Sequence, residues 1–258
     1  MTSSLDSSKA YECERCQDQG YIVDGWTAKE CSCLEQKKLM ARMKNAMIPE
    51  EFVESRFDTY RVQTPTQEIM MDAIKDYLRH FEQIKDQTNN SLGFIAKFGE
   101  QRLRETKNSA ERARLKQMHN NFGLGKTHLQ VAAAKWLIKH GYSTLIVSDV
   151  SLMEDLSRSR NYDDDGIEFS RLLGAVIRAK VLIWDDIGKA KKSEFRLDMY
   201  YQIINERYKA KRPILYSSNE DMETLTERIG DASASRLFGM SKERIYAVEG
   251  QDYRLKGA

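Results

Sequence analysis

The chain has 258 residues, of which 41% are hydrophobic and 31% charged, and its formal net charge is +2. This length can bury one or two cores. The small net charge excludes a global basic field for nucleic acid, so any such site has to be local. The polar, serine-rich segment 1–9 lacks the apolar run of a signal peptide, and no stretch approaches the ~18 apolar residues of a membrane span. The sequence therefore predicts a cytoplasmic globular protein without membrane contact.

The four cysteines form two close pairs, Cys13-x2-Cys16 and Cys31-x-Cys33. Disulfides are rare in a cytoplasmic chain, whereas four thiolates in close pairs suit a tetrahedral zinc ion. The glycines and aromatic residues between the pairs indicate a small hairpin. A module this small cannot be held by a hydrophobic core, so zinc would supply its folding energy. We predict a structural zinc site, with redox-active or free thiols as the alternative.

A basic, helix-prone segment with a partial methionine stripe follows at residues 34–47. Core packing and a partner surface both fit such a stripe. Ile48-Pro49 ends this helix. We place the domain boundary there, between an N-terminal zinc module with its linker helix, residues 1–47, and a second domain, residues 48–258.

The second domain opens with a long amphipathic helix, predicted over residues 66–85, whose apolar face runs from Ile69 to Phe81. Residues 91–98 form a buried strand that should feed a phosphate-binding loop. The segment 102–119 intervenes, with six cationic and two anionic residues, a net charge of 6 − 2 = +4. We interpret it as an insertion inside the loop, with Gly99 as the displaced first glycine. It is either a solvated helical excursion or a basic arm that contacts DNA or a neighbouring subunit's nucleotide.

The loop itself is the segment 120–129, Asn-Asn-Phe-Gly-Leu-Gly-Lys-Thr-His-Leu. Its glycines bring backbone N–H groups close to a polyphosphate, and the helix that begins here adds the positive end of its dipole. Lys126 is predicted to bind the outer phosphates, and the Thr127 hydroxyl is predicted to coordinate Mg²⁺. The first glycine of the usual motif is replaced by Asn120, which tolerates a left-handed conformation. The predicted nucleotide-binding residues are Asn121, Phe122, Gly123, Leu124, Gly125, Lys126, Thr127 and His128, together with Asp185 at the end of a later strand.

Strands predicted at residues 143–148, 180–188, 213–219 and 244–249 alternate with helices, which indicates a parallel α/β sheet.

Carboxylates end one of these strands, at the edge of the sheet where ligands bind. Asp185 is predicted to hold Mg²⁺, directly or through water, and Asp186 to polarise the attacking water. Asn219, at the end of the next strand, would orient that water or sense the γ-phosphate. The alternatives are two carboxylates that cap a turn and an asparagine that is a simple turn residue.

Taken together, these motifs resemble the helicase-loader ATPases of the DnaC/DnaI type, a branch of the AAA+ superfamily close to the IstB-like ATPases. The resemblance is carried by the cysteine pairs, Ile-Pro-Glu at 48–50, Gly-Leu-Gly-Lys-Thr-His-Leu at 123–129, Trp-Asp-Asp-Ile-Gly at 184–188, Ser-Ser-Asn at 217–219, Ala-Ser-Arg-Leu at 234–237 and Gly-Gln-Asp-Tyr-Arg at 250–254. The insertion departs from the usual pattern and looks like a variant from phage or mobile elements.

The resemblance implies a P-loop AAA+ domain with strand order 5-1-4-3-2. It implies that Asn219 is sensor I and that Arg236 is an arginine finger acting in trans, with Arg228 as a second candidate and Arg254 in a role like sensor II. Only 258 − 236 = 22 residues follow Arg236, so we expect no C-terminal lid. The predicted catalytic residues are Lys126, Asp185, Asp186, Asn219 and Arg236.

We therefore predict an ATPase that helps load a hexameric, DnaB-like replicative helicase onto DNA during replication initiation or restart. The zinc module would bind the helicase. The AAA+ domain would self-assemble with ATP·Mg²⁺ and contact single-stranded DNA, through the 102–119 arm and Lys189, Lys191 and Lys192, which also fit a solvated face. Two alternatives stay open: an IstB-type transposition helper, against which the cysteine module argues, and an adaptor that uses ATP as a switch with little hydrolysis.

Overall fold

The computed structural model of the protein describes residues 13, 16–17, 19–24, 27–31, 34, 48–162 and 164–250. The density of internal contacts divides the chain into two units, Met1–Asn45 and Ala46–Ala258. The helix predicted over residues 34–47 lies outside the described residues, apart from Leu34. None of the helices among the described residues has the length and apolar character needed to cross a membrane.

The first unit contains the predicted hairpin. Strands β1 (Tyr21–Asp24) and β2 (Thr27–Glu30) pair in antiparallel fashion, with Tyr21 opposite Glu30 and Asp24 opposite Thr27. The hairpin leads directly back to Cys31, whose N–H donates to the carbonyl of Gly20 at 2.8 Å. The two ends of the hairpin are therefore held together beside the cysteines.

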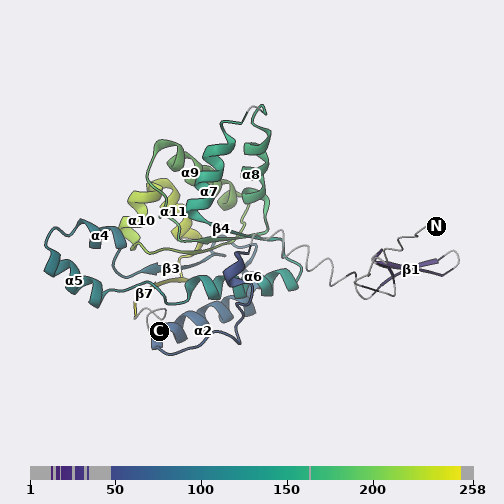
Figure 1. The fold of residues 1–258 in the computed structure, drawn as a ribbon, viewed down its shortest axis with the longest axis horizontal. Coiled ribbons are helices and arrows are strands. Elements are labelled where there is room, and N and C mark those ends of the chain that lie inside the picture. Colours follow the sequence, from purple (N-terminus) through teal and green to yellow (C-terminus); the bar gives the residue numbers. More distant parts are fainter. Residues whose placement is uncertain are drawn as a thin grey trace, which may run out of the picture. The chain divides into compact units, whose positions relative to one another are not determined.

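The second unit is built on a five-stranded parallel sheet (Figure 1). Its strands are β3 (Leu92–Ala96), β4 (Thr144–Ser148), β5 (Val181–Asp185), β6 (Ile214–Ser217) and β7 (Ile245–Val248), in the spatial order β4-β5-β6-β3-β7. Counted along this unit the order reads 2-3-4-1-5, which is the predicted 5-1-4-3-2 in reverse. The central strands are buried on both faces, as their continuous apolar sequences predict.

Helices cover both faces of the sheet (Figure 1). Those packed on one face are α2 (Pro65–Arg79), α3 (Phe81–Ile84) and α6 (Lys126–Lys139). Those on the other face are α7 (Asp149–Ser159), α8 (Ile167–Arg178), α9 (Glu194–Lys209), α10 (Met222–Ile229) and α11 (Asp231–Met240). The remaining helical segments are a 3₁₀ turn, η1 (Glu50–Phe52), and the inserted helices α4 (Glu100–Glu105) and α5 (Ser109–Met118). No helix follows β7 within the described residues, which end at Gly250.

The prediction of one long helix over residues 66–85 is wrong in two respects. It is interrupted at His80, whose φ and ψ of −98° and 8° separate α2 from α3. Ile69 does not belong to the buried face, since 53% of it is exposed, whereas Met70, Ile74 and Tyr77 are buried. The apolar stripe is thus narrower than its sequence pattern, because position 69 lies beside the face that α2 packs against α6 and the sheet.

A buried carboxylate joins several elements beneath one end of the sheet. Asp149, the first residue of α7, is fully buried and accepts hydrogen bonds from Trp184 Nε1 at 2.9 Å, the Ala190 N–H at 2.8 Å and the Tyr200 hydroxyl at 2.7 Å. Burial raises the pKa of Asp149 to about 6, although these three donors oppose the shift. This carboxylate fixes β5 and the turn after it against α7 and α9.

We expect Asp149→Asn to destabilise the second unit by about 2 kcal/mol or more, because the amide nitrogen would face donors and leave at least one buried polar group unpaired. Urea unfolding of the purified variant measures this loss. Asp155→Asn is the matched control: its carboxylate is 40% exposed and, in the part of the chain that the structure describes, pairs only with Arg158, so it should cost under ~0.5 kcal/mol. Equal midpoints for the two variants would contradict the linking role of Asp149.

Candidate nucleotide-binding site

The phosphate loop connects the end of the insertion to α6. Gly123 and Gly125 have φ angles of +63° and +84°, in the region that favours glycine. A Cβ atom on Gly125 would lie 2.5 Å from Cε2 of Tyr60, so no side chain fits there. Gly125 is also the N-cap of α6, whose first residues are Lys126 and Thr127. The loop therefore delivers these two side chains at the N-terminus of a helix, as its sequence predicts.

Side-chain amides replace the missing first glycine. Asn120 has no left-handed backbone, contrary to our expectation; instead its Nδ2 donates to the carbonyls of Phe122 at 3.1 Å and Gly250 at 2.7 Å. Asn121 is buried, and its Nδ2 donates to the carbonyls of Phe98 at 3.2 Å and Asn219 at 3.1 Å. These bonds fasten the start of the loop to the ends of β3, β6 and β7.

The inserted segment leaves the sheet at Gly99, which does not act as the first glycine of the loop. Its φ is −68°, and its N–H donates to Asp221 Oδ2 at 2.8 Å, so this N–H is not free to bind phosphate. A Cβ on Gly99 would lie 2.8 Å from Glu220 Oε2. Glycine is needed here so that two acidic side chains can approach the start of α4.

Asp185 ends β5 and faces the loop. Its Oδ2 accepts from the Thr127 hydroxyl at 2.9 Å and its Oδ1 from the Ser217 hydroxyl at 2.6 Å. Oriented to satisfy both of its groups, the Gln130 amide donates to Asp185 Oδ1 at 2.9 Å and accepts from the Ser217 N–H at 2.9 Å. Burial and the neighbouring Asp186 raise the pKa of Asp185. A hydroxyl and a carboxylate oxygen thus converge here, which is a donor set that fits Mg²⁺.

Asp186 follows the strand in a left-handed conformation, with a φ of +53°. The hydrogen bond from its N–H to the Ser217 hydroxyl, at 3.0 Å, holds this strained backbone in place. Its Oδ1 accepts from Asn219 Nδ2 at 3.0 Å, and its Oδ2 pairs with Lys189 at 2.6 Å. The carboxylate is therefore turned away from the strand and towards the residue predicted to be sensor I.

Lys126 completes the arrangement from α6. Its ammonium is buried and donates to the Asn219 side-chain oxygen at 2.6 Å and to the Ser218 carbonyl at 3.1 Å. Burial lowers its pKa to about 8, although the charges of Asp186 and Asp185 oppose the shift. The predicted residues Lys126, Thr127, Asp185, Asp186 and Asn219 thus form one continuous polar network.

This network borders a pocket of about 250 Å³. Its walls include eight of the nine predicted nucleotide-binding residues, all except Asp185, together with Phe52, Asp186, Lys189 and Asn219. The pocket therefore joins a helix N-terminus, an ammonium, a hydroxyl and the Asp186 carboxylate, and the Thr127 hydroxyl links it to Asp185; these are the groups that a magnesium-bound nucleotide requires.

The linker before α2 also lies on the loop. The Tyr60 hydroxyl donates to the Leu124 carbonyl at 2.8 Å, and its ring lies 5.3 Å from that of His128. Nε2 of His128 lies 2.8 Å from the carbonyl of Arg56. Tyr60 and His128 border a smaller pocket of about 120 Å³ beside Gly123 and Gly125, lined also by Thr59, Arg61 and Gln67. Sequence reasoning missed this contribution, as it missed Gln130 and Ser217.

The predicted arginines lie in different places. Arg236 borders none of these pockets; its Nη1 donates to the Ala232 carbonyl at 2.8 Å and its guanidinium lies over the Tyr201 ring, 5.2 Å from the ring centroid. Arg228 lines a neighbouring pocket that shares residues with the loop pocket. Arg254 lies outside the described residues. The structure thus separates Arg236 from the site of its own chain.

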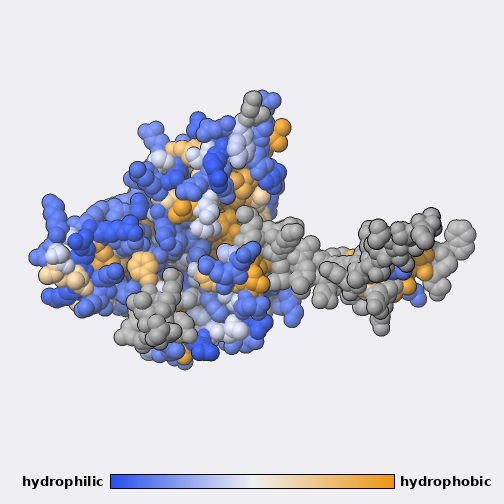
Figure 2. Space-filling view, in the orientation of Figure 1, coloured by the Kyte–Doolittle hydropathy of each residue, from blue (hydrophilic) through white to orange (hydrophobic). Residues whose placement is uncertain are grey.

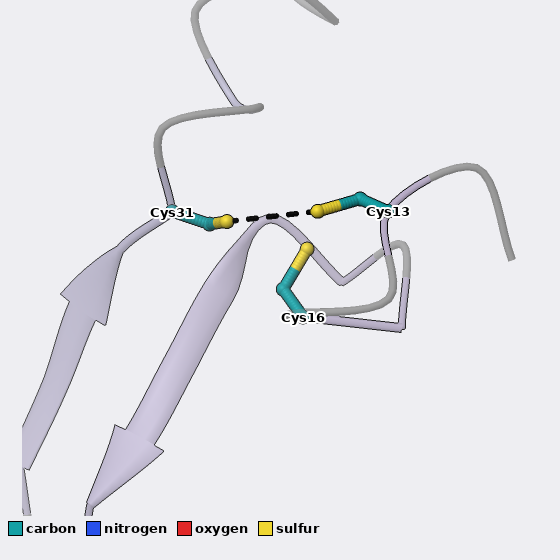
Figure 3. A group of neighbouring side chains, drawn as sticks. All are labelled: Cys13, Cys16 and Cys31. Carbon is teal, nitrogen blue, oxygen red and sulfur yellow. Dashed lines mark hydrogen bonds between the residues drawn. The ribbon is translucent and has the colours of Figure 1, made fainter.

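Three of the four cysteines gather beside the N-terminal hairpin (Figure 3). The sulfur atoms of Cys13, Cys16 and Cys31 all lie within 4.8 Å of one another, and those of Cys13 and Cys31 are 3.8 Å apart. Two thiolates on a tetrahedral zinc ion at ~2.3 Å are also ~3.8 Å apart. Cys16 Sγ further accepts the Gly20 N–H at 3.3 Å. The cluster fits a zinc ion; Cys33, the predicted fourth ligand, lies outside the described residues.

Comparison with known proteins assigns the chain to a family. Residues 110–257, more than half of the chain, match the IstB-like ATP binding proteins. The chain is 28% identical to the phage-like element PBSX protein XkdC of Bacillus subtilis, over 97% of its own length and 86% of that protein. It is also 28% identical to the replicative helicase loader DnaC of Escherichia coli, over 45% of this chain and 46% of DnaC.

Solved structures share the fold of the second unit. The crystal structure of the DnaC helicase loader matches 78% of this chain and all of that one, with a TM-score of 0.60 at 18% identity. DnaI matches 82% of this chain and 98% of its own, with a TM-score of 0.58 at 18% identity. The fold is the AAA+ fold of these proteins, and by sequence the chain belongs to the family of IstB-like ATP binding proteins.

Proposed function

We propose that the protein is a Mg²⁺-dependent ATPase that loads a hexameric, DnaB-like replicative helicase onto DNA in the cytoplasm. The observation that carries this proposal is the network of Lys126, Thr127, Asp185, Asp186 and Asn219 around the phosphate loop. The similarity to DnaC adds the kind of partner, since that relative is a replicative helicase loader.

In this proposal nucleotide binding rearranges the network. The Lys126 ammonium leaves Ser218 and Asn219 for oxygens of the β- and γ-phosphates. Thr127 and Asp185 would hold Mg²⁺, which supplies charge neutralisation on the phosphates when it is bound. Released from Lys126, the Asn219 side chain can face the γ-phosphate while it still donates to Asp186.

Asp186 and Asn219 then orient a water molecule for attack on the γ-phosphorus, so that the bond to the bridging oxygen breaks and ADP leaves. Arg236 acts in trans: its place outside the pockets of its own chain supports a role in a neighbour's site. ATP would therefore be hydrolysed mainly in assemblies of this chain.

We assign the two units different tasks. The zinc module with its linker helix, residues 1–47, docks on the helicase, and residues 48–258 form the ATPase that self-assembles and contacts single-stranded DNA. The cysteine cluster supports a module that zinc folds locally. Lys189 is removed from the predicted DNA contacts, since it pairs with Asp186 in the nucleotide site.

The basic arm retains exposed cations for DNA. Arg102 and Arg104 pair with Glu223 and Glu100, respectively. By contrast Lys107, Arg112, Arg114 and Lys116 are exposed and form no ion pair within the described ranges. α5 buries none of its residues and protrudes with α4 from the sheet (Figure 1). The surface of this part of the molecule is largely hydrophilic (Figure 2). A helix without an apolar face suits a polyanion better than an apolar partner.

A second candidate is a transposition helper ATPase. The matched family is named for IstB, and the chain is 30% identical to an insertion-sequence IS5376 putative ATP-binding protein of Geobacillus stearothermophilus, over 52% of this chain and 53% of that one. A third is an adaptor that uses ATP as a switch and barely hydrolyses it. Partner binding and turnover distinguish the three.

We expect the zinc-loaded chain to form a stoichiometric complex with the replicative helicase of its host, and we expect removal of zinc to abolish it, because the docking module would unfold. Native mass spectrometry with and without ATP measures both. Lys126→Ala, which disables nucleotide binding but not the cysteines, should still form the complex. If no complex forms under any condition, the loader proposal fails, and a transposase or a DNA filament becomes the partner to test.

The affinity for Mg·ATP should change little between pH ~7, where the phosphates are ionised, and pH ~8, and should fall by up to about tenfold per pH unit above about 8, because Lys126 loses its proton there and has to regain it to bind phosphate. Titration calorimetry in buffers of different ionisation enthalpy measures the affinity and the proton uptake together. Lys126→Ala should bind weakly at every pH. An affinity that stays unchanged up to pH ~10 would contradict the lowered pKa of this ammonium, and wild-type affinity in Lys126→Ala would contradict its role.

Replacing Arg112, Arg114 and Lys116 by glutamine should weaken binding of single-stranded DNA and reduce the slope of log K against log salt by about 2, or ~0.7 for each lost phosphate contact. Fluorescence anisotropy over a salt series measures this. A matched triple variant replaces three exposed cations elsewhere, Lys75, Arg171 and Lys209, by glutamine. Equal losses in the two variants would assign the effect to net charge and not to the arm.

A further inference from the structure

A second pocket, of about 300 Å³, adjoins the loop pocket at its carboxylate end. The two pockets share Asp186, Lys189 and Asn219. Around the second pocket, the further walls are Glu100, Gln101, Arg104 and Glu105 from the start of the insertion, Ile187, Ser218 and Glu220 from the strand ends, and Arg228 from α10. It therefore extends the site past the two residues that would orient the attacking water.

The insertion forms a fixed wall of this pocket. The Glu100 N–H donates to the Asn219 carbonyl at 3.0 Å, and the Gln101 N–H donates to Glu220 Oε2 at 3.0 Å. Arg102 donates to the Thr224 hydroxyl at 3.2 Å and pairs with Glu223. Because α4 is bonded to the residues that follow β6, the pocket is a built part of the fold and not a gap under a loose arm.

Arg228 enters this pocket with unused donors. Its Nε is buried without a hydrogen-bond partner, and the guanidinium forms no ion pair or hydrogen bond within residues 48–162 and 164–250. Nearby, Gln101 Oε1 is also buried without a partner. Buried polar atoms without a hydrogen-bond partner are rare in native proteins and usually indicate a bound ligand or water molecule. Two of them border the same pocket, on opposite elements.

The position of Arg228 is set by close packing. Its Cβ would lie 3.4 Å from a Cβ built on Gly188, two residues after Asp186. Carboxylates line the same pocket, among them Glu220. Burial raises the pKa of Glu220, and the positive charge of Arg228 opposes this shift. A cation in the same pocket wall as Glu220 and Asp186 would reduce the repulsion that these carboxylates exert on an incoming γ-phosphate.

We propose that Arg228 contacts the γ-phosphate of ATP bound in its own chain. A guanidinium offers a planar fork that matches phosphate oxygens, and Arg228 lines the pocket that shares Asp186 and Asn219 with the loop pocket. This inference rests on the proposed ATPase function and deepens it. Each site would use two arginines, Arg228 in cis and Arg236 from the neighbouring copy.

The first test separates phosphate contact from a structural role. In Arg228→Gln the affinity for Mg·AMP-PNP should fall about 10- to 100-fold, because a charged hydrogen bond is lost, while the affinity for Mg·ADP should change less than about twofold. Titration calorimetry on the full, zinc-loaded chain measures both. Arg171→Gln, an exposed arginine outside both pockets, should change neither affinity. An equal loss for both nucleotides, or no loss, would overturn the proposal.

The second test separates cis from trans action by mixing inactive chains. Arg236→Gln mixed with Lys126→Ala should regain ATP turnover, because the Lys126→Ala chain still supplies Arg236 to its neighbour. Arg228→Gln mixed with Lys126→Ala should stay at least about 10³-fold below wild type, since the chain that binds ATP lacks its own Arg228. Turnover regained in the second mixture would place Arg228 in trans and overturn the proposal. A wild-type chain without turnover would refute the ATPase function, while the affinity ratio would still decide the role of Arg228.

Discussion

The arrangement of the site depends on one electrostatic constraint: a buried ammonium has to be balanced at the end of a buried sheet. Lys126 has two carboxylates nearby but hydrogen-bonds to Asn219 and Ser218, while Asp186 turns to Asn219 and Lys189. Asn219 therefore stands between the cation and the anion and bonds to both. A bound γ-phosphate would compete for each of these partners, so the network can report whether the nucleotide carries that phosphate.

The fold and the core of the site were predictable because their signals are local. A continuous apolar run that ends in two aspartates is sufficient to place β5 and its carboxylates, and the glycine-lysine-threonine sequence is sufficient to place the start of α6. Parallel strands end at one edge, so these groups had to meet there with Asn219. Features that depend on tertiary packing, such as the exposure of Ile69 and the break at His80, could not be predicted from the local sequence pattern.

The parts that sequence reasoning missed depend on contacts between distant residues. Tyr60 bonds to a carbonyl 64 positions away, and no motif around it indicates that contact. The sequence suggested that Gly99 is a glycine of the phosphate loop. In the structure, glycine is needed there because two acidic residues, more than 100 positions later in the chain, pack against it. The sequence does not reveal that the insertion has two parts: α4 is bonded to the residues that follow β6, whereas α5 is exposed. Such pairings become visible only when the sheet brings strand ends together.

A crystal structure of the zinc-loaded chain with Mg²⁺ and AMP-PNP would test the central claim most directly. The account predicts that the Lys126 ammonium moves from Ser218 and Asn219 to phosphate oxygens, that Thr127 and Asp185 hold the metal, and that the γ-phosphate lies beside Asn219. A nucleotide bound elsewhere, or one bound at the loop with Lys126 still on the Ser218 carbonyl, would contradict it.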